Sequence, residues 1–192
     1  LLFDDTSCEQ GRNFNNKMWN ALKLVKMWKP AADTGAPVPD FAVEWMENRL
    51  NEVHAEVEKL FKDFRLSEAL KAIYSLIWDD FCSWYLEWIK PGYEQPIDAG
   101  VYEKTIGFFE RLVQLLHPFM PFVTEELYHL LRDRQAGDDL VIRQFAAPAA
   151  THQPVLVEGA LAKEVITSIR DARNKNQVKP KDTIALYIET RH

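Results

Sequence analysis

The chain has 192 residues, of which 47% are hydrophobic, and a formal net charge of −6. This hydrophobic fraction suffices for a continuous core, and the content of seven glycines and eleven phenylalanines excludes a disordered, collagen-like or turn-dense β protein. The negative charge excludes a protein that binds nucleic acid with its whole surface, because neutralising phosphates requires cations. We expect one folded domain with an appendage, in which the local distribution of charge matters more than its sum.

The two cysteines, Cys8 and Cys82, lie far apart and match neither a disulfide framework nor a CxxC metal or redox site. This pattern predicts a reducing, cytoplasmic environment. The sequence has no run of about 18 apolar residues and does not begin like a signal peptide, so we expect no membrane contact. Because it begins without methionine and ends just after an expected strand, we expect it to be part of a longer protein.

The first predicted helix runs from about Asp4 to Trp28, and Pro30 ends it. Its apolar positions follow at spacings of four, four and three, which places them on one face; they are Phe14, Met18, Leu22 and Val25. Between residues 11 and 30 the chain has no acid and five basic residues, namely Arg12, Lys17, Lys23, Lys26 and Lys29. This segment is either the solvated side of an amphipathic helix or a surface that binds RNA.

Two long helices are predicted next. From Asp40 to Phe64, apolar residues recur at alternating spacings of three and four, which is typical of a helix packed lengthwise on its neighbours. Ser67 is a suitable N-cap for the following helix, which we expect to continue to Pro91. Its aromatic residues favour the core of a bundle, with base stacking as the alternative; they are Trp78, Phe81, Trp84, Tyr85 and Trp88.

A fourth helix is predicted from about Ile97 to Leu116. It must break or bend within residues 117–121, because two prolines three positions apart remove two backbone donors. Thr124 or a neighbouring residue then begins a shorter helix that reaches about Leu131. Four to five antiparallel helices joined by short loops predict an all-α antiparallel bundle over residues 1–145.

Residues 146–192 have a different character and are expected to form a small α/β extension. A linker over residues 146–154 precedes a helix from Leu156 to about Asn176. Residues 183–189 alternate like a strand, which would need a partner strand. From Lys163 to Lys181 there are six basic and two acidic residues, so positive charge gathers here as well.

No catalytic or metal-binding pattern is complete. A di-iron bundle requires two Glu-x-x-His pairs on its helices, and the predicted helices carry one, formed by Glu126 and His129, which we interpret as part of a solvated helix face. His117 has no Ser or Cys nucleophile with an evident base, so a capping or packing role is expected for it. The chain also lacks HExxH, GxSxG and a glycine-rich phosphate loop.

Four segments together carry a resemblance to the valyl-tRNA synthetases. Residues 11–21 read GRNFNNKMWNA and resemble the family's GRNFxNKLWNA segment. Residues 77–91 resemble its WxxFCDWYLExxKP helix. Residues 115–128 are similar to LLHPFMPFxTEELW, which class Ia synthetases share in looser forms. Residues 165–174 resemble its VxxIRxxR helix, so the likeness spans nearly the whole chain.

The resemblance implies the anticodon-binding bundle of a class Ia aminoacyl-tRNA synthetase. It further implies a longer valine–tRNA ligase that joins L-valine to tRNA(Val) with ATP and Mg²⁺ and removes threonine in an editing domain. Neither HIGH nor KMSKS occurs in the 192 residues. We therefore expect this chain to have no catalytic or metal-binding residue and no cofactor of its own. The implied partners are the anticodon arm and the catalytic domain of the same polypeptide.

The resemblance also implies that the first helix faces the anticodon. The lysine of the GRNFxNK motif, here Lys17, is the strongest candidate contact. Weaker candidates lie within two turns of it, suited to phosphates or base edges of an unstacked loop; they are Arg12, Asn16, Asn20 and Lys23. Asn13 and Asn20 could equally tie the helix to its neighbours. Leu24 replaces a phenylalanine that family members often carry, which leaves base stacking at this position without support.

Two alternatives remain open from the sequence. One is the corresponding bundle of an isoleucyl- or leucyl-tRNA synthetase, which would bind a different tRNA. The other is a structural or protein-interaction bundle that binds no RNA. Every hypothesis in which the chain binds RNA requires the side of the first helix that carries no acid between residues 11 and 30 to reach solvent.

Overall fold

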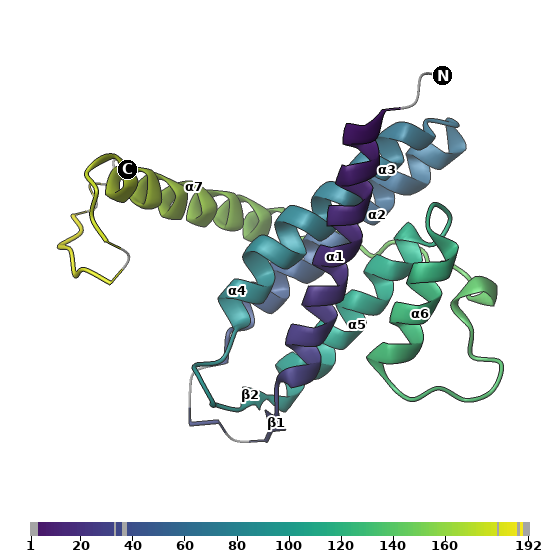
Figure 1. Cartoon of the computed structure of the whole chain (residues 1–192), viewed down its shortest axis with the longest axis horizontal. Coiled ribbons are helices and arrows are strands. Elements are labelled where there is room, and N and C mark those ends of the chain that lie inside the picture. The colour runs from purple at the N-terminus through teal and green to yellow at the C-terminus, as the bar shows by residue number, and fades with distance from the viewer. Residues whose placement is uncertain (1–3, 33, 36–37, 180, 188, 190–192) are drawn as a thin grey trace.

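The computed structural model describes residues 4–32, 34–35, 38–179, 181–187 and 189. They form a helical bundle from which α7 extends to one side (Figure 1). The long helices are α1 (Asp5–Met27), α2 (Asp40–Lys62), α5 (Ala99–Leu116) and α7 (Gln153–Lys175). The shorter elements are α3 (Leu66–Ser75), η1 (Leu76–Tyr85), α4 (Leu86–Ile89), α6 (Pro121–Leu131), η2 (Leu140–Ile142), β1 (Pro30–Ala31) and β2 (Ile97–Asp98). The predicted all-α class is confirmed.

Helix α1 matches its prediction to within one residue at each end. Asp4 caps it by accepting a hydrogen bond from the backbone N–H of Thr6 at 3.1 Å. Its four predicted core positions are all buried. They pack against η1 and α6, so the opposite side of α1 faces solvent.

The central helix spans α3, η1 and α4 without a break. It begins at Leu66, so the prediction of Ser67 as N-cap is wrong; Ser67 lies in the first turn instead. Its middle part, η1, is π-helical, and the Ser83 hydroxyl donates to the carbonyl of Trp78 at 2.8 Å. The aromatic residues of this helix belong to the core or pack against it, as predicted.

The first residues of α5 and α6 differ from the predictions, whereas their last residues agree. Ile97 and Asp98 form β2, which pairs in parallel with β1, and Asp98 caps α5 by accepting from the N–H of Val101 at 3.0 Å. Helix α6 begins at Pro121, not at Thr124, because a proline at the first helical position loses no hydrogen bond. Thr124 is buried and lies 2.8 Å from Nδ1 of His117, which gives His117 the expected packing role across the break.

The expected strand at residues 183–189 is absent from residues 181–187 and 189, and Ile188 lies outside the described residues. No described strand lies beside this segment, and a strand without a partner leaves its backbone groups unpaired. Ile184 and Leu186 instead line a cavity of about 460 Å³ beside α7. The division of the chain at residue 145 stays a prediction. None of the described helices is long and apolar enough to span a membrane.

A buried carboxylate and a glycine are two of the points at which α7 contacts the bundle. Asp80 of η1 forms ion pairs with Arg49 of α2, at 2.9 Å, and with Lys163 of α7. Gly159 of α7 packs on the indole of Trp45, which is 1% exposed. Three elements therefore meet at a single acidic side chain.

Candidate nucleic-acid interface

The weaker site residues share one exposed face of α1. Arg12, Asn16, Asn20 and Lys23 follow at spacings of four, four and three, the same pattern as the buried positions but displaced by two residues. All four are exposed. The only ion pair of Arg12 among the described residues is with Glu9 on its own helix, at 3.7 Å. This face can therefore reach a ligand in solvent.

Lys17 lies between this face and the bundle. It is half-buried, its Nζ donates to Ser83 Oγ at 2.9 Å, and Nζ lies 4.2 Å from the centroid of the Trp78 ring. Burial raises the pKa of the neighbouring Cys82 thiol to about 12, so that thiol is neutral at physiological pH. The contacts with Ser83 and Trp78 anchor Lys17 to η1, whereas the four exposed residues of α1 point into solvent. A contact between Lys17 and nucleotides stays a prediction.

A pocket at the carboxyl end of α1 extends the exposed face. It has a volume of about 590 Å³, and its walls include Leu24, Trp28, Lys29, Lys90 and Tyr93. Tyr93 is 90% exposed, so its ring is available to a ligand. Aromatic surfaces beside ammonium groups are what an unstacked base and its phosphate require.

Sequence reasoning missed this pocket except for Leu24. Its two walls are more than sixty residues apart in the chain and meet because β1 pairs with β2; the N–H of Ile97 donates to the carbonyl of Lys29 at 3.0 Å. The available signal was that Trp28–Lys29 and Lys90–Tyr93 each combine a cation with an aromatic ring. Leu24, where the resemblance implies a phenylalanine in other family members, lines this pocket.

A family model described as the anticodon-binding domain of tRNA ligases matches residues 43–188. The chain belongs to this family. Helix α1, which carries the predicted contacts, precedes the matched region. The family model therefore covers the helices from α2 onward, and the candidate site lies on α1, which packs against them.

This anticodon-binding domain is similar over nearly all of its length to proteins named valine–tRNA ligase. It is 50% identical to that of Phocaeicola vulgatus over 98% of the chain, and 46% identical to that of Parabacteroides distasonis over 99%. It is also 46% identical to that of Porphyromonas gingivalis over 100% of the chain. In each case the chain covers 22% of the relative's length.

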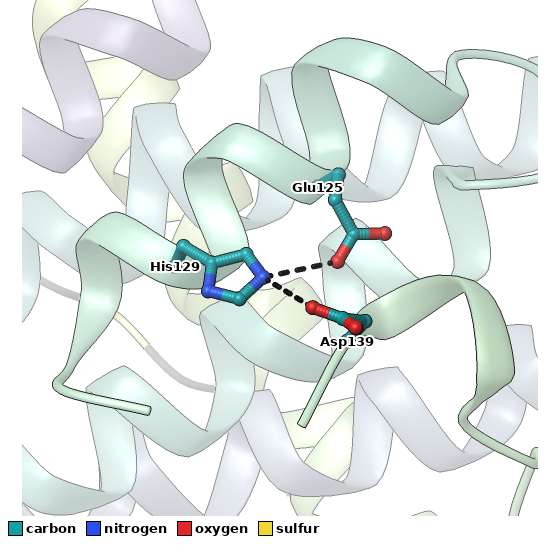
Figure 2. Close-up of side chains that lie close together, drawn as sticks. All are labelled: Glu125, His129 and Asp139. Atoms are coloured by element: carbon teal, nitrogen blue, oxygen red, sulfur yellow. Dashed lines mark hydrogen bonds and ion pairs between the residues drawn. The ribbon is translucent and has the colours of Figure 1, made fainter. Parts of the chain in front are cut away.

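The anticodon-binding domain has a second group of polar side chains on α6, distant in sequence from α1. His129 does not pair with Glu126, which is exposed, but with Glu125 on the preceding turn and with Asp139 before η2 (Figure 2). Glu125, His129 and Asp139 therefore form a group of three side chains that the sequence analysis did not predict.

Proposed function

We propose that this domain binds the anticodon arm of tRNA(Val) as part of a valine–tRNA ligase. The observation that carries the proposal is the exposed face of α1 over residues 12–23, which carries cations and no acid and leads into a pocket whose walls hold aromatic and cationic side chains beside Glu94. The family supports an anticodon-binding role, and the similarity to valine–tRNA ligases supports the choice of tRNA. In this proposal the ligation of valine with ATP and Mg²⁺, in the cytoplasm, occurs in other domains of the same polypeptide.

Each part of the surface has its own task. Arg12 and Lys23 neutralise backbone phosphates, which fixes the orientation of the RNA loop without reading its sequence. Asn16 and Asn20 offer amide groups to base edges, and the pocket beside Tyr93 accepts a base that has left its stack. The π-helical turn of η1 places Ser83 and Trp78 where they hold the Lys17 ammonium at the border of this surface.

The proposal is tested by measuring binding of the chain to valine tRNA, isoleucine tRNA and bulk tRNA at two salt concentrations. We expect valine tRNA to bind most tightly and every affinity to fall as salt rises, since each phosphate contact releases counterions. Preference for isoleucine tRNA would replace the proposal with the corresponding domain of an isoleucyl-tRNA synthetase. Absence of binding at low salt would contradict the proposal and favour a structural or protein-interaction bundle that binds no RNA.

Lys17→Ala is expected to weaken binding of valine tRNA by about 1–3 kcal/mol if the ammonium meets a base edge, and by less if it meets a phosphate. Ser83→Ala is the control, because it removes the partner of Lys17 and keeps its charge. Lys104→Ala on α5, whose ammonium pairs with Glu47, controls for the general loss of one cation. Equal affinities of Lys17→Ala and the unsubstituted chain would refute the assignment.

Tyr93→Ala is expected to weaken binding by roughly 1–3 kcal/mol, the usual contribution of one stacked base. Tyr93→Phe should retain the affinity, because the ring and not the hydroxyl supplies the stacking surface. Since the side chain is 90% exposed, neither change should affect folding. The same titration with valine tRNA measures both variants, and an unaltered Tyr93→Ala would remove the pocket from the interface.

A further inference from the structure

Three potential metal ligands converge where α6 meets the loop that follows it. Glu125 and His129 lie on successive turns of α6, and Asp139 immediately precedes η2. One ligand atom of each lies within 4.8 Å of the other two. Figure 2 shows both carboxylates directed at the same imidazole nitrogen.

This arrangement leaves a position for a cation. Nε2 of His129 lies 3.3 Å from Oε1 of Glu125 and 3.1 Å from Oδ1 of Asp139. If Nε2 carries a hydrogen, both carboxylates share it. If Nε2 carries its lone pair, three electron-rich atoms face one another, and a cation bound between them would relieve their repulsion.

The distances from Nε2 of His129 to the two carboxylates are close to those of tetrahedral coordination. An ion bound about 2.0–2.2 Å from its nitrogen and oxygen ligands holds them roughly 3.3–3.6 Å apart. The distance from Nε2 to Glu125 falls in this range, and Asp139 needs to move by only a few tenths of an ångström. The imidazole and carboxylates are ligand types that suit Zn²⁺, and two carboxylates neutralise its charge.

The ligands are held in place by groups that do not bind the ion. Oε1 and Oε2 of Glu125 accept backbone hydrogen bonds from Leu140 at 2.6 Å and Val141 at 3.0 Å. The loop carrying Asp139 is fixed by a 2.8 Å hydrogen bond from the Tyr128 hydroxyl to Asp138. Such outer contacts orient metal ligands and raise affinity.

We infer that Glu125, His129 and Asp139 bind one divalent ion of the zinc class, with water as the remaining ligand. The ion joins α6 to the loop that leads into η2. The inference departs from the expectation that the chain has no metal ligand, which considered only Glu126 with His129. It does not depend on the proposed RNA-binding function, because these residues lie on elements other than α1, β1 and the loop 90–95.

The inference is tested by titrating the whole chain with Zn²⁺ in a calorimeter and with Co²⁺ in a visible spectrometer. We expect one Zn²⁺ per chain and the strong visible absorption of tetrahedral Co²⁺. His129→Ala and Asp139→Asn should each weaken Zn²⁺ binding by at least tenfold and abolish the Co²⁺ absorption. These side chains are 39% and 46% exposed, so the variants should fold, which circular dichroism checks.

His152→Ala is the matched control. His152 also lies 3.1 Å from a carboxylate, that of Glu44, but the structure describes no second carboxylate beside it. This variant should bind Zn²⁺ like the unsubstituted chain. Absence of Zn²⁺ uptake by the unsubstituted chain, or equal affinity of His129→Ala, would show that a shared hydrogen alone holds the three side chains together.

Discussion

Asp80→Ala is expected to lower the free energy of unfolding by about 3 kcal/mol or more. The Asp80 side chain is 7% exposed and pairs with Arg49 and Lys163, whose side chains are 29% and 24% exposed. Removing one partner of a buried ion pair leaves charges that have lost water without gaining a counter-ion, which costs about 3–5 kcal/mol. Arg49 keeps Glu52 as a second partner, so the loss should lie at the lower end of this range.

Asp79→Ala provides the comparison for this variant. Asp79 is the adjacent residue, but it is exposed, and its one hydrogen bond among the described side chains is accepted from the hydroxyl of Ser75 at 2.9 Å. Its removal should change stability by no more than about 0.5 kcal/mol. Urea unfolding followed by tryptophan fluorescence measures both variants. Equal stabilities would mean that the carboxylate of Asp80 does not hold α2, η1 and α7 together in solution.

The ion pairs of Asp80 also show why local charge in the sequence was an incomplete guide. The basic stretch at residues 163–181 could have been a second RNA surface. Lys163 instead faces Asp80, and Arg170 lies 5.2 Å from the ring of Trp84. Arg173 donates to the backbone carbonyls of Lys179 and Asp182, in the segment that follows α7. Counting charges cannot reveal these uses, because Lys163 and Arg170 are each more than eighty residues away from their partners in the chain.

Helix positions were predictable where the apolar spacing is regular. The prediction of α2 agrees with the structure at its first residue and differs by two at its last, because its core positions recur over six turns. The π-helical middle of the central helix was not predictable, since its aromatic residues satisfy an α-helical spacing equally well. The strand at residues 183–189 failed for the opposite reason: alternation specifies a strand only when a partner strand is present.

The candidate interface was predicted in part. Four of its five predicted residues are exposed on one face because helical periodicity fixes their direction. The direction of Lys17 depends on Ser83 and Trp78, which belong to another helix. Tyr93 and Lys90 reach α1 only through the pairing of β1 with β2, two residues each, which is too short a pattern to recognise in the sequence.

Gly159→Ala is expected to lower the free energy of unfolding by about 3 kcal/mol, because it disturbs the packing of α7, although alanine is the better helix former. A Cβ atom at this position would lie 2.1 Å from Cδ1 and 2.2 Å from Nε1 of Trp45. The indole is buried and cannot move aside, so the overlap exceeds that of ordinary overpacking, which costs about 1–3 kcal/mol. Helix α7 must instead move away from α2, which should expose the linker before it to protease.

Gly107→Ala in α5 is the same chemical change without the obstacle. No atom lies within 4 Å of a Cβ at Gly107, so only the helix propensity acts, and this variant should be more stable by about 0.5–1 kcal/mol. Urea unfolding and limited proteolysis of both variants should therefore give effects of opposite sign. If both variants were more stable, α7 would not rest on Trp45 of α2. Lys163 would then reach Asp80 without the close contact between α7 and α2 that Gly159 permits.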